Sequence, residues 1–159
     1  MGESIKSKVY RWGLNWYPAI RGMGGRVTYL SADRRELHVK VPLNWRTRNY
    51  VGSIFGGSMY GTVDPYHMVM FIWALGPDYI VWDKAASIRF KRPGSSTLRA
   101  VFKIEDEELE SVRAELEEKG KIERVYSVEL VDEEGEVCVV VEKRIYFRKK
   151  EKSRADSSG

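Results

Sequence analysis

This chain has few of the residues that make disulfides, metal clusters or membrane spans. Its 159 residues include one cysteine, Cys138, which cannot form an intrachain disulfide, and two histidines, which make no metal cluster. The apolar segment Met59–Leu75 contains Asp64 and His67 and is therefore a poor membrane span. Residues 1–6 lack the apolar stretch of a signal peptide, and no motif for nucleic-acid binding is found. We expect a cytoplasmic protein that binds no metal, membrane or nucleic acid.

What the chain does contain is enough apolar material for one packed domain. Hydrophobic residues make up 43% of it and aromatic residues 12%, and the length is typical of a single domain. The formal charge of +4 is uneven, because Lys143–Arg154 holds seven Lys or Arg against one acid, Glu151. We interpret this stretch as a solubilising, frayed terminus. The predicted organisation is an N-terminal helical extension over 1–20, a single domain over 21–148 and a basic, disordered tail over 149–159.

Hydrophobic periodicity predicts an α+β fold. Residues 58–75 are apolar on nearly every face, which is typical of a helix buried in a core. One such helix needs a sheet that curls around it, so we expect a curved antiparallel β-sheet wrapped around a central buried α-helix. Two more helices are expected, over 5–20 and Asp106–Lys119. The predicted strands are Arg26–Leu30, Glu36–Val41, Tyr79–Arg92, Thr97–Ile104, Ile122–Val131 and Val137–Phe147.

The long predicted strand Tyr79–Arg92 has an apolar face and a polar face. Strict alternation puts Asp83 on the face opposite Phe90. The apolar face carries Ile80, Trp82, Ala86, Ile88 and Phe90, interrupted by Lys84, and the other face carries Asp83, Ser87, Arg89 and Lys91.

The segment over 49–64 carries the groups that thioester chemistry needs. Gly56 and Gly57 lie at the start of the long apolar segment, where free backbone N–H groups can hold a carbonyl oxygen as it becomes anionic. Asp64 lies inside that segment, and a carboxylate in apolar surroundings can hold a water molecule or attack an acyl carbon.

A purely structural interpretation of the same residues is also open. Asp64 followed by Pro65 is a good N-cap with a first-turn proline, so a shorter helix could begin at Pro65. Gly56 and Gly57 would then be loop glycines. His67 is interpreted as a hydrogen-bonded core histidine rather than a catalytic one.

The chain resembles the hotdog-fold thioesterases, especially their phenylacetyl-CoA thioesterase-like branch. Members of that branch carry an Asn, then five residues, then His-Gly-Gly, and an Asp seven positions after the second glycine. Here Asn49 precedes Phe55-Gly56-Gly57 by the same interval, and Asp64 is seven positions after Gly57. The stretch 86–94 is similar to the family strand that follows the helix, and the resemblance spans about residues 20–147. Among the hotdog proteins, the chain most resembles a subgroup known as a domain of unknown function.

The resemblance implies a hotdog fold and a role for each matching residue. Gly57 would polarise the thioester carbonyl through its N–H, Asn49 would orient the loop or the water, and Asp64 would act as base or nucleophile. Asp83 would assist Asp64, at a position where relatives often carry Ser or Thr, if the strand is aligned through Phe90. The family histidine is replaced by phenylalanine. The expected substrate contacts are Phe55, Gly56, Ser58, Arg89, Lys91 and Arg92, the last three as phosphate contacts or as solubilising side chains.

The spacing of the site residues predicts a homodimer. Seven residues of helix separate Gly57 from Asp64 by roughly 10 Å, which is too far for one carbonyl and one attacking water. An antiparallel neighbouring copy could bring its own Asp64 to this Gly57. We therefore expect composite sites in a dimer or in a dimer of dimers, as the resemblance also implies.

Three functions follow from these residues. The leading one is an acyl-CoA thioesterase that hydrolyses a thioester to a carboxylic acid and a free thiol, with no cofactor except coenzyme A as part of the substrate. The second is a non-catalytic acyl-CoA or fatty-acyl binding module, because Phe55 replaces the histidine and Asp83 adds a second carboxylate. The third is a hydratase or dehydratase, which is disfavoured because His67 follows Asp64 by only three residues.

Overall fold

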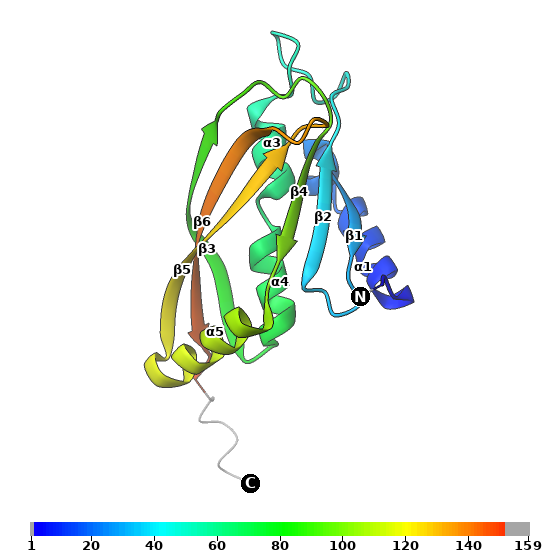
Figure 1. Cartoon of the computed structure of the whole chain (residues 1–159). Helices are drawn as coiled ribbons and strands as arrows, with labels where there is room; N and C mark the ends of the chain where they lie inside the picture. Colours follow the sequence, from blue (N-terminus) through cyan, green and yellow to red (C-terminus); the bar gives the residue numbers. More distant parts are fainter. Residues whose placement is uncertain (1, 152–159) are drawn as a thin grey trace.

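The computed structural model describes residues 2–151, and within that range six strands form a single antiparallel sheet (Figure 1). The strand order is β1-β2-β4-β5-β6-β3, so β1 and β3 are the two edges. Strands β4 and β5 pair through one residue pair only, Arg99 with Val131, which lets the sheet bend there. The strands are β1 (Arg26–Leu30), β2 (Glu36–Val41), β3 (Tyr79–Phe90), β4 (Leu98–Lys103), β5 (Lys121–Val131) and β6 (Val137–Lys149).

Helices cover one face and one edge of the sheet. Helix α1 begins at a reciprocal Ser4–Ser7 capping box and runs beside β1. The Asn15 amide accepts from the Val27 N–H (2.8 Å) and donates to the Val27 carbonyl (3.0 Å), which satisfies part of the free edge of β1. The helices are α1 (Ile5–Trp16), α2 (Pro18–Met23), α3 (Gly56–Val63), α4 (Tyr66–Leu75) and α5 (Asp106–Lys119). No helix of the described range has the length and apolar content to cross a membrane.

The central helix expected over 58–75 is two helices, α3 and α4. It begins at Gly56 and is interrupted at Asp64 and Pro65, because proline has no N–H to donate to the preceding turn. Pro65 occupies the N-cap position of α4 with no side-chain cap hydrogen bond, so the interpretation of Asp64 as the N-cap is wrong. Asp64 is instead the C-cap residue of α3.

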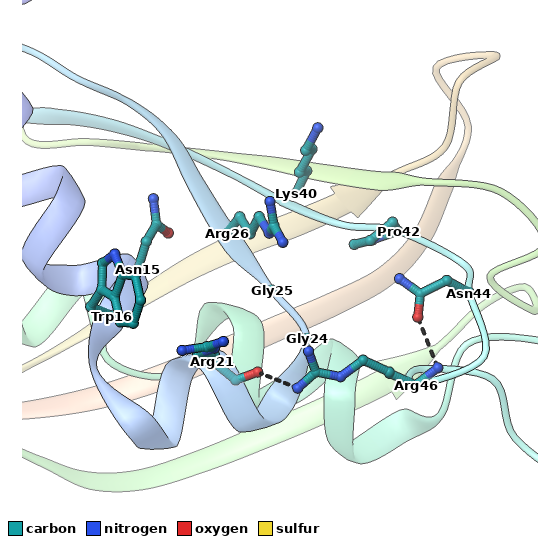
Figure 2. A pocket seen from close by; sticks show the side chains of 10 residues that line it. All are labelled: Asn15, Trp16, Arg21, Gly24, Gly25, Arg26, Lys40, Pro42, Asn44 and Arg46. Carbon is teal, nitrogen blue, oxygen red and sulfur yellow. Dashed lines mark hydrogen bonds between the residues drawn. The ribbon is translucent and has the colours of Figure 1, made fainter.

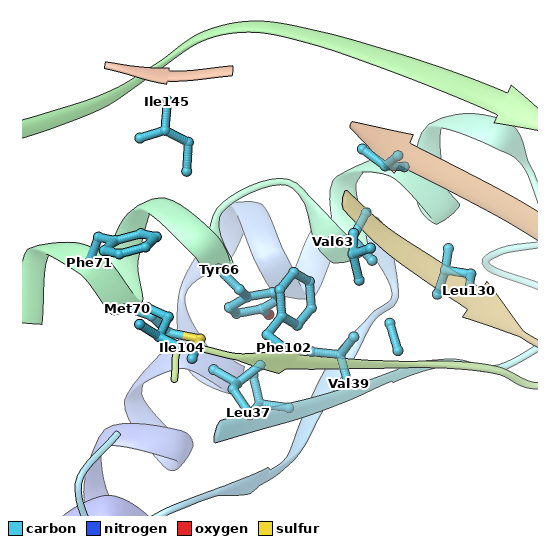
Figure 3. Close-up of a cluster of buried hydrophobic side chains, with 14 of the residues drawn as sticks. Leu37, Val39, Val63, Tyr66, Met70, Phe71, Phe102, Ile104, Leu130 and Ile145 are labelled. Carbon is cyan, nitrogen blue, oxygen red and sulfur yellow. The ribbon is translucent and has the colours of Figure 1, made fainter. Parts of the chain in front are cut away.

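The core lies between the concave face of the sheet and α3–α4 (Figure 3). Leu37 and Val39 of β2 and Phe102 of β4 face the helices. Phe102 makes edge contacts with Tyr66 and His67, with ring centroids 5.4 and 4.8 Å away. Each fully buried side chain of this kind contributes about 1.5–3 kcal/mol. The expected architecture, a curved antiparallel sheet around a central helix, is confirmed.

A β-bulge in β3 changes which side chains face the core. The register with β6 shifts between Asp83 and Ala85, so Lys84 is the extra residue. Asp83 pairs with the buried Ile145, and Phe90 pairs with the buried Val139. The prediction that Asp83 and Phe90 lie on opposite faces is therefore wrong: both point inward. Trp82, expected on the apolar side, is exposed and stacks on Tyr146.

The basic stretch that begins at Lys143 is part of the fold for most of its length. Strand β6 continues to Lys149, whose side chain pairs with Glu117 at 2.6 Å. The Lys150 N–H donates to the Asp78 carbonyl at 2.8 Å. Residues 143–147 thus lie in the strand predicted over Val137–Phe147, and Lys149 and Lys150 extend this part of the fold into the tail predicted over 149–159. Residues 152–159 of that tail lie outside the described range.

Candidate functional site

A buried lysine holds two aspartates together. The Lys143 side chain is only 2% exposed, and its ammonium lies 2.5 Å from Asp64 Oδ1 and 2.9 Å from Asp83 Oδ2. It also donates to the Asp64 carbonyl (3.1 Å) and to the Tyr60 hydroxyl (3.4 Å). Burying a charge is costly unless it is paired and hydrogen-bonded, and these acceptors meet that need. We call Lys143, Asp64, Asp83 and Tyr60 the lysine cluster.

Three elements position the lysine cluster. Asp64 lies where α3 stops at Pro65, and Tyr60 precedes it by one helical turn. Asp83 points inward because of the bulge at Lys84. Lys143 lies on the inner face of β6, opposite Ala86 of β3. The helix break and the bulge, two irregularities of the backbone, therefore bring the two carboxylates to one ammonium.

The cluster shifts the pKa of three of its members. Burial lowers the pKa of Lys143, but hydrogen bonds and attraction from Asp64 and Asp83 outweigh burial and raise it above its ordinary value. Burial raises the pKa of Asp83 against the opposing effect of Lys143. Burial and the neighbouring Asp64 carboxylate raise the pKa of Tyr60. At neutral pH, Lys143 is therefore an ammonium and Tyr60 a neutral hydroxyl.

Asp64 is the member of the cluster that faces outward. Its side chain is 42% exposed, compared with 21% for Asp83. Lys143 contacts Oδ1 of Asp64, and the Tyr60 hydroxyl is also hydrogen-bonded to this carboxylate. Asp83 Oδ1 is buried without a hydrogen-bond partner in the same range. Asp64 thus has one oxygen fixed by Lys143 and a side chain that remains partly exposed.

A second feature of the site is the start of α3, where three backbone donors are free. The first intrahelical hydrogen bond runs from the Met59 N–H to the Phe55 carbonyl at 3.1 Å. For the N–H groups of Gly56, Gly57 and Ser58, the described part of the chain offers no acceptor, as is usual at a helix start. Ser58 itself is buried.

A cavity of about 460 Å³ lies beside the start of α3. Among the predicted site residues, Asn49, Gly56, Lys91 and Arg92 line it. Phe90 lines it as well, and its ring lies so close to Gly56 that a β-carbon there would be 3.0 Å from Phe90 Cζ. The structure therefore brings four predicted residues together around one opening.

The aromatic ring before the glycines covers part of the helix start. Phe55 is 57% exposed, and a β-carbon added at Gly57 would collide with its ring. Asn49 organises the preceding loop: its Oδ1 accepts from the N–H groups of Val51 and Ser53, and its Nδ2 donates to Ser53 Oγ at 2.8 Å. Asn49 thus orients the loop that leads into α3.

The three basic residues predicted on β3 and its end do not act as a group. Arg89 is exposed and belongs to the outer face of the strand, opposite Val140. Lys91 and Arg92 line the cavity. Arg92 also pairs with Glu136 at 3.0 Å.

His67 is a core residue, as predicted, but the expected hydrogen bond is missing at one nitrogen. The ring is buried between Phe102 and Tyr126, and Nδ1 has no partner within the described range. Burial, helped by the charge of Lys143, lowers the pKa of His67 to about 4. His67 is therefore neutral at physiological pH. Residues 2–151 hold no group of His, Cys, Asp and Glu side chains arranged for a metal ion.

Lys143 is the site residue that sequence reasoning missed, because it was grouped with the basic terminus. A signal for it exists in the strand itself. The inward positions of β6 are occupied by Val139, Val141, Ile145 and Phe147, and Lys143 alone interrupts this apolar alternation. A single charge on the buried face of a strand indicates a buried partner of opposite charge.

Comparison with known proteins agrees with this architecture. A family model described as "Domain of unknown function (DUF4442)" matches residues 6–147. No functionally curated protein matches the sequence.

Three similar solved structures share the fold at low sequence identity. A protein of unknown function from Pseudomonas aeruginosa, described as a probable thioesterase, has a TM-score of 0.80 at 20% identity and covers 94% of this chain and 100% of its own. A protein of unknown function from Chlorobaculum tepidum has a TM-score of 0.72 at 17% identity, covering 91% and 95%. A thioesterase from Haemophilus influenzae has a TM-score of 0.64 at 14% identity, covering 89% and 90%. The fold is therefore the hotdog fold.

Proposed function

The chain belongs to this family of unknown function, and we propose that it is an acyl-CoA thioesterase that hydrolyses a thioester at Asp64. The observation that carries the proposal is the state of the Asp64 carboxylate. One oxygen is fixed by the buried Lys143, while the side chain is 42% exposed and can meet a water or an acyl group. The thioesterases among the similar structures support the same reaction class.

In the proposed reaction, Asp64 accepts a proton from a water molecule as the water oxygen bonds to the acyl carbon. The electron pair of the carbonyl bond moves to the carbonyl oxygen, and the resulting oxyanion is held by free N–H groups such as that of Gly57. The C–S bond then breaks, and the departing thiolate takes the proton from Asp64. In the alternative route, an oxygen of Asp64 bonds to the acyl carbon, the C–S bond breaks and the thiolate departs. Water then hydrolyses the resulting anhydride to the carboxylic acid and restores the Asp64 carboxylate.

Lys143 would be a positioning residue in this reaction. Its ammonium fixes Oδ1 of Asp64 and neutralises one of two close carboxylates, so both can occupy the same site. Asp83, whose pKa is raised by burial, would act through Lys143 rather than on the substrate.

A second copy of the chain would complete the site. Gly57 and Asp64 are at opposite ends of α3, so roughly 10 Å of helix separates them. Strand β3 is an edge strand with its outer side unpaired, and Trp82 and Phe90 on it are exposed. A free edge with exposed apolar side chains favours pairing with another strand. We propose a homodimer in which the donors of one copy and the Asp64 of the other act on one thioester.

The cavity at the start of α3 would receive the carrier part of the substrate. Its apolar lining includes Met59 and Phe90, and Lys91 and Arg92 supply positive charge. Phosphates of coenzyme A would meet these two side chains. Arg89 has no place in this arrangement, because it lies on the outer face of β3.

Thiol release from a panel of acyl-CoA thioesters tests the function. Asp64→Asn is expected to lower kcat/KM at least about 100-fold, since it removes the base and keeps the shape. Glu142→Gln is the matched control, because Glu142 precedes Lys143 on β6 but lies on the outer face beside Ser87. Equal turnover of wild type and Asp64→Asn would rule out the proposed chemistry.

A non-catalytic acyl-CoA binding module is the second candidate, and one observation favours it. The Lys143 ammonium hydrogen-bonds to one carboxylate oxygen and to the backbone carbonyl of Asp64, which suits a structural role for this residue. This candidate predicts stoichiometric binding of an acyl-CoA with no thiol release from any member of the panel. Hydrolysis that depends on Asp64 would eliminate it.

A further inference from the structure

A cavity of about 460 Å³ lies at the other edge of the sheet, where α1 and α2 meet β1 and β2 (Figure 2). Arg26 and Lys40 extend from the two neighbouring strands to one side of it, and nearby the Arg46 guanidinium donates to the Arg21 backbone carbonyl at 3.4 Å. None of the described residues that line this cavity is acidic. We call it the basic pocket; the residues used below are Trp16, Arg21, Arg26, Lys40, Asn44 and Arg46.

The cations of the basic pocket are placed where they repel one another. Arg26 is directly opposite Lys40, and Lys40 is directly opposite Arg99 on β4, so three positive side chains form one row on the outer face. Like charges in directly opposed positions destabilise a sheet. The ion pairs found within residues 2–151 include none of these three side chains. A bound anion would relieve this repulsion.

The walls of the basic pocket are fixed before any ligand binds. The buried Thr47 hydroxyl donates to the Pro42 carbonyl at 2.5 Å and accepts from the Asn44 N–H at 3.0 Å, which holds the loop after β2. Gly24 has a φ of +83°, and a β-carbon there would collide with Thr47, so this glycine lets the loop approach α2. A preorganised site loses less entropy on binding.

One wall of the pocket is aromatic. Trp16 is 54% exposed, and the Arg21 guanidinium lies 4.8 Å from the centroid of its ring. A flat ring beside several donors suits a ligand that has both an anionic group and a flat or apolar part.

We propose that the basic pocket binds a small organic phosphate, with the phosphate between Arg26, Lys40 and Arg46 and the organic part against Trp16. Arginine and lysine donors give short, charge-assisted hydrogen bonds to phosphate oxygens. The pocket shares no lining residue with the cavity at the start of α3, and the lysine cluster involves β6 and β3, at the opposite edge of the sheet. The inference therefore goes beyond the proposed hydrolysis and does not depend on it.

Calorimetric titration of the full chain with ADP tests the proposal, with adenosine and inorganic pyrophosphate as partial probes. ADP is expected to bind more tightly than adenosine. Its affinity is expected to be lower at high salt than at low salt, because salt screens the charges of the pocket and the phosphates. The double variant Arg26→Gln/Lys40→Gln is expected to weaken ADP binding at least about tenfold, since two charge-assisted bonds are lost. Its unliganded thermal stability should equal or exceed that of the wild type, which separates lost binding from lost folding.

Three further variants add a test of the aromatic wall and two controls. Trp16→Leu should weaken ADP binding and leave pyrophosphate binding unchanged. Arg148→Gln, which removes an exposed charge of β6, and Asp64→Asn should bind ADP like the wild type. ADP binding that is no tighter than adenosine binding, or that survives the double variant unchanged, would overturn the proposal whether or not the protein hydrolyses thioesters.

The same titrations distinguish two sources of the phosphate. Coenzyme A carries a nucleotide end with phosphates, so displacement of ADP by free coenzyme A, with a higher KM and unchanged kcat in the double variant, would identify the substrate's own carrier. ADP binding that coenzyme A does not displace would identify a separate phosphorylated molecule.

Discussion

The lysine cluster and the basic pocket differ in whether their positive side chains have carboxylate partners in the same chain. In the lysine cluster, a single ammonium is almost wholly buried and meets two carboxylates of the same chain. In the basic pocket, Arg26 and Lys40 are directly opposite each other, and the described residues that line the pocket offer them no carboxylate. In the first arrangement the folded chain itself supplies the counter-charges, whereas in the second a negative charge would come from a ligand.

This difference separates charges that stabilise the folded chain from charges that, as we propose, bind a ligand. Removing one partner of a buried ion pair is strongly destabilising, because the remaining charge is left unpaired in the low-dielectric interior of the protein. Exposed cations cost little individually, but opposed like charges reduce stability slightly until an anion binds. Substitutions in the two regions should therefore change stability in opposite directions.

The largest effect is expected for Lys143→Met. The substitution leaves Asp64 and Asp83 facing each other without a counter-charge, and we expect a loss of about 3 kcal/mol in the free energy of unfolding, since both carboxylates keep part of their hydration. Thiol release should also fall at least about 100-fold. Urea unfolding and the acyl-CoA assay measure the two effects. Arg144→Met, a change at the exposed next residue, is the control, and equal stability of the two variants would contradict the central role of Lys143.

The next effect in size is the contribution of the buried His67 to the pH dependence of stability. Its folded-state pKa of about 4 lies below the value of an unfolded histidine, so the unfolded state takes up a proton first as the pH falls. This contribution is present above pH 6.5 and is lost as the pH falls from about 6.5 towards 4. We expect the wild type to lose about 2 kcal/mol more than His67→Phe between pH 7 and pH 5. Parallel stability curves in urea for the two proteins would show that His67 is not held neutral.

Asp83→Asn should have a smaller effect on turnover than Asp64→Asn. Asp83 pairs with Lys143 but is less exposed than Asp64, so its loss should leave the base in place and weaken its positioning. We expect kcat to fall about tenfold, which corresponds to about 1.4 kcal/mol, with KM unchanged. Steady-state kinetics on one acyl-CoA decide the point. A loss as large as that of Asp64→Asn would make Asp83 a catalytic residue.

The smallest change is expected at the basic pocket. Arg26→Gln/Lys40→Gln should raise the free energy of unfolding of the unliganded protein by about 0.5 kcal/mol, because opposed cations are removed. Raising the salt concentration should shrink this gain, since exposed charges are screened. A clear loss of stability would mean that these cations support the fold, and the contrast between the two regions would disappear.

Much of the fold could be predicted from periodicity, and the exceptions are local. The predicted strands lie within two residues of the observed ones at their starts and ends, because apolar alternation reflects burial directly. The break at Pro65 was not separable from a capped helix start, since Asp-Pro suits both.

The candidate site was harder to predict than the fold. Asn49, Gly56 and Asp64 were proposed from their spacing, but spacing does not show which side chains meet across the sheet. The shared pairing of Asp64 and Asp83 with Lys143 depends on the bulge at Lys84 and on a lysine that is distant in sequence. An ion pair between residues that are distant in sequence leaves no periodic pattern in the sequence. The only signal for this one is the charged residue Lys143 on an otherwise apolar strand face.

The extra residue at Lys84 also affects how relatives should be compared with this chain. It shifts the alternation of inward and outward side chains by one position between the two halves of β3. Asp83 and Phe90 therefore share a face, although residues seven positions apart in a regular strand lie on opposite faces. A gapless alignment with a regular strand is correct on one side of Lys84 and wrong on the other. If such an alignment is anchored at Phe90, it will pair Asp83 with an outward-facing residue. The counterpart of Asp83 in a relative without the bulge is expected one position nearer to the counterpart of Phe90.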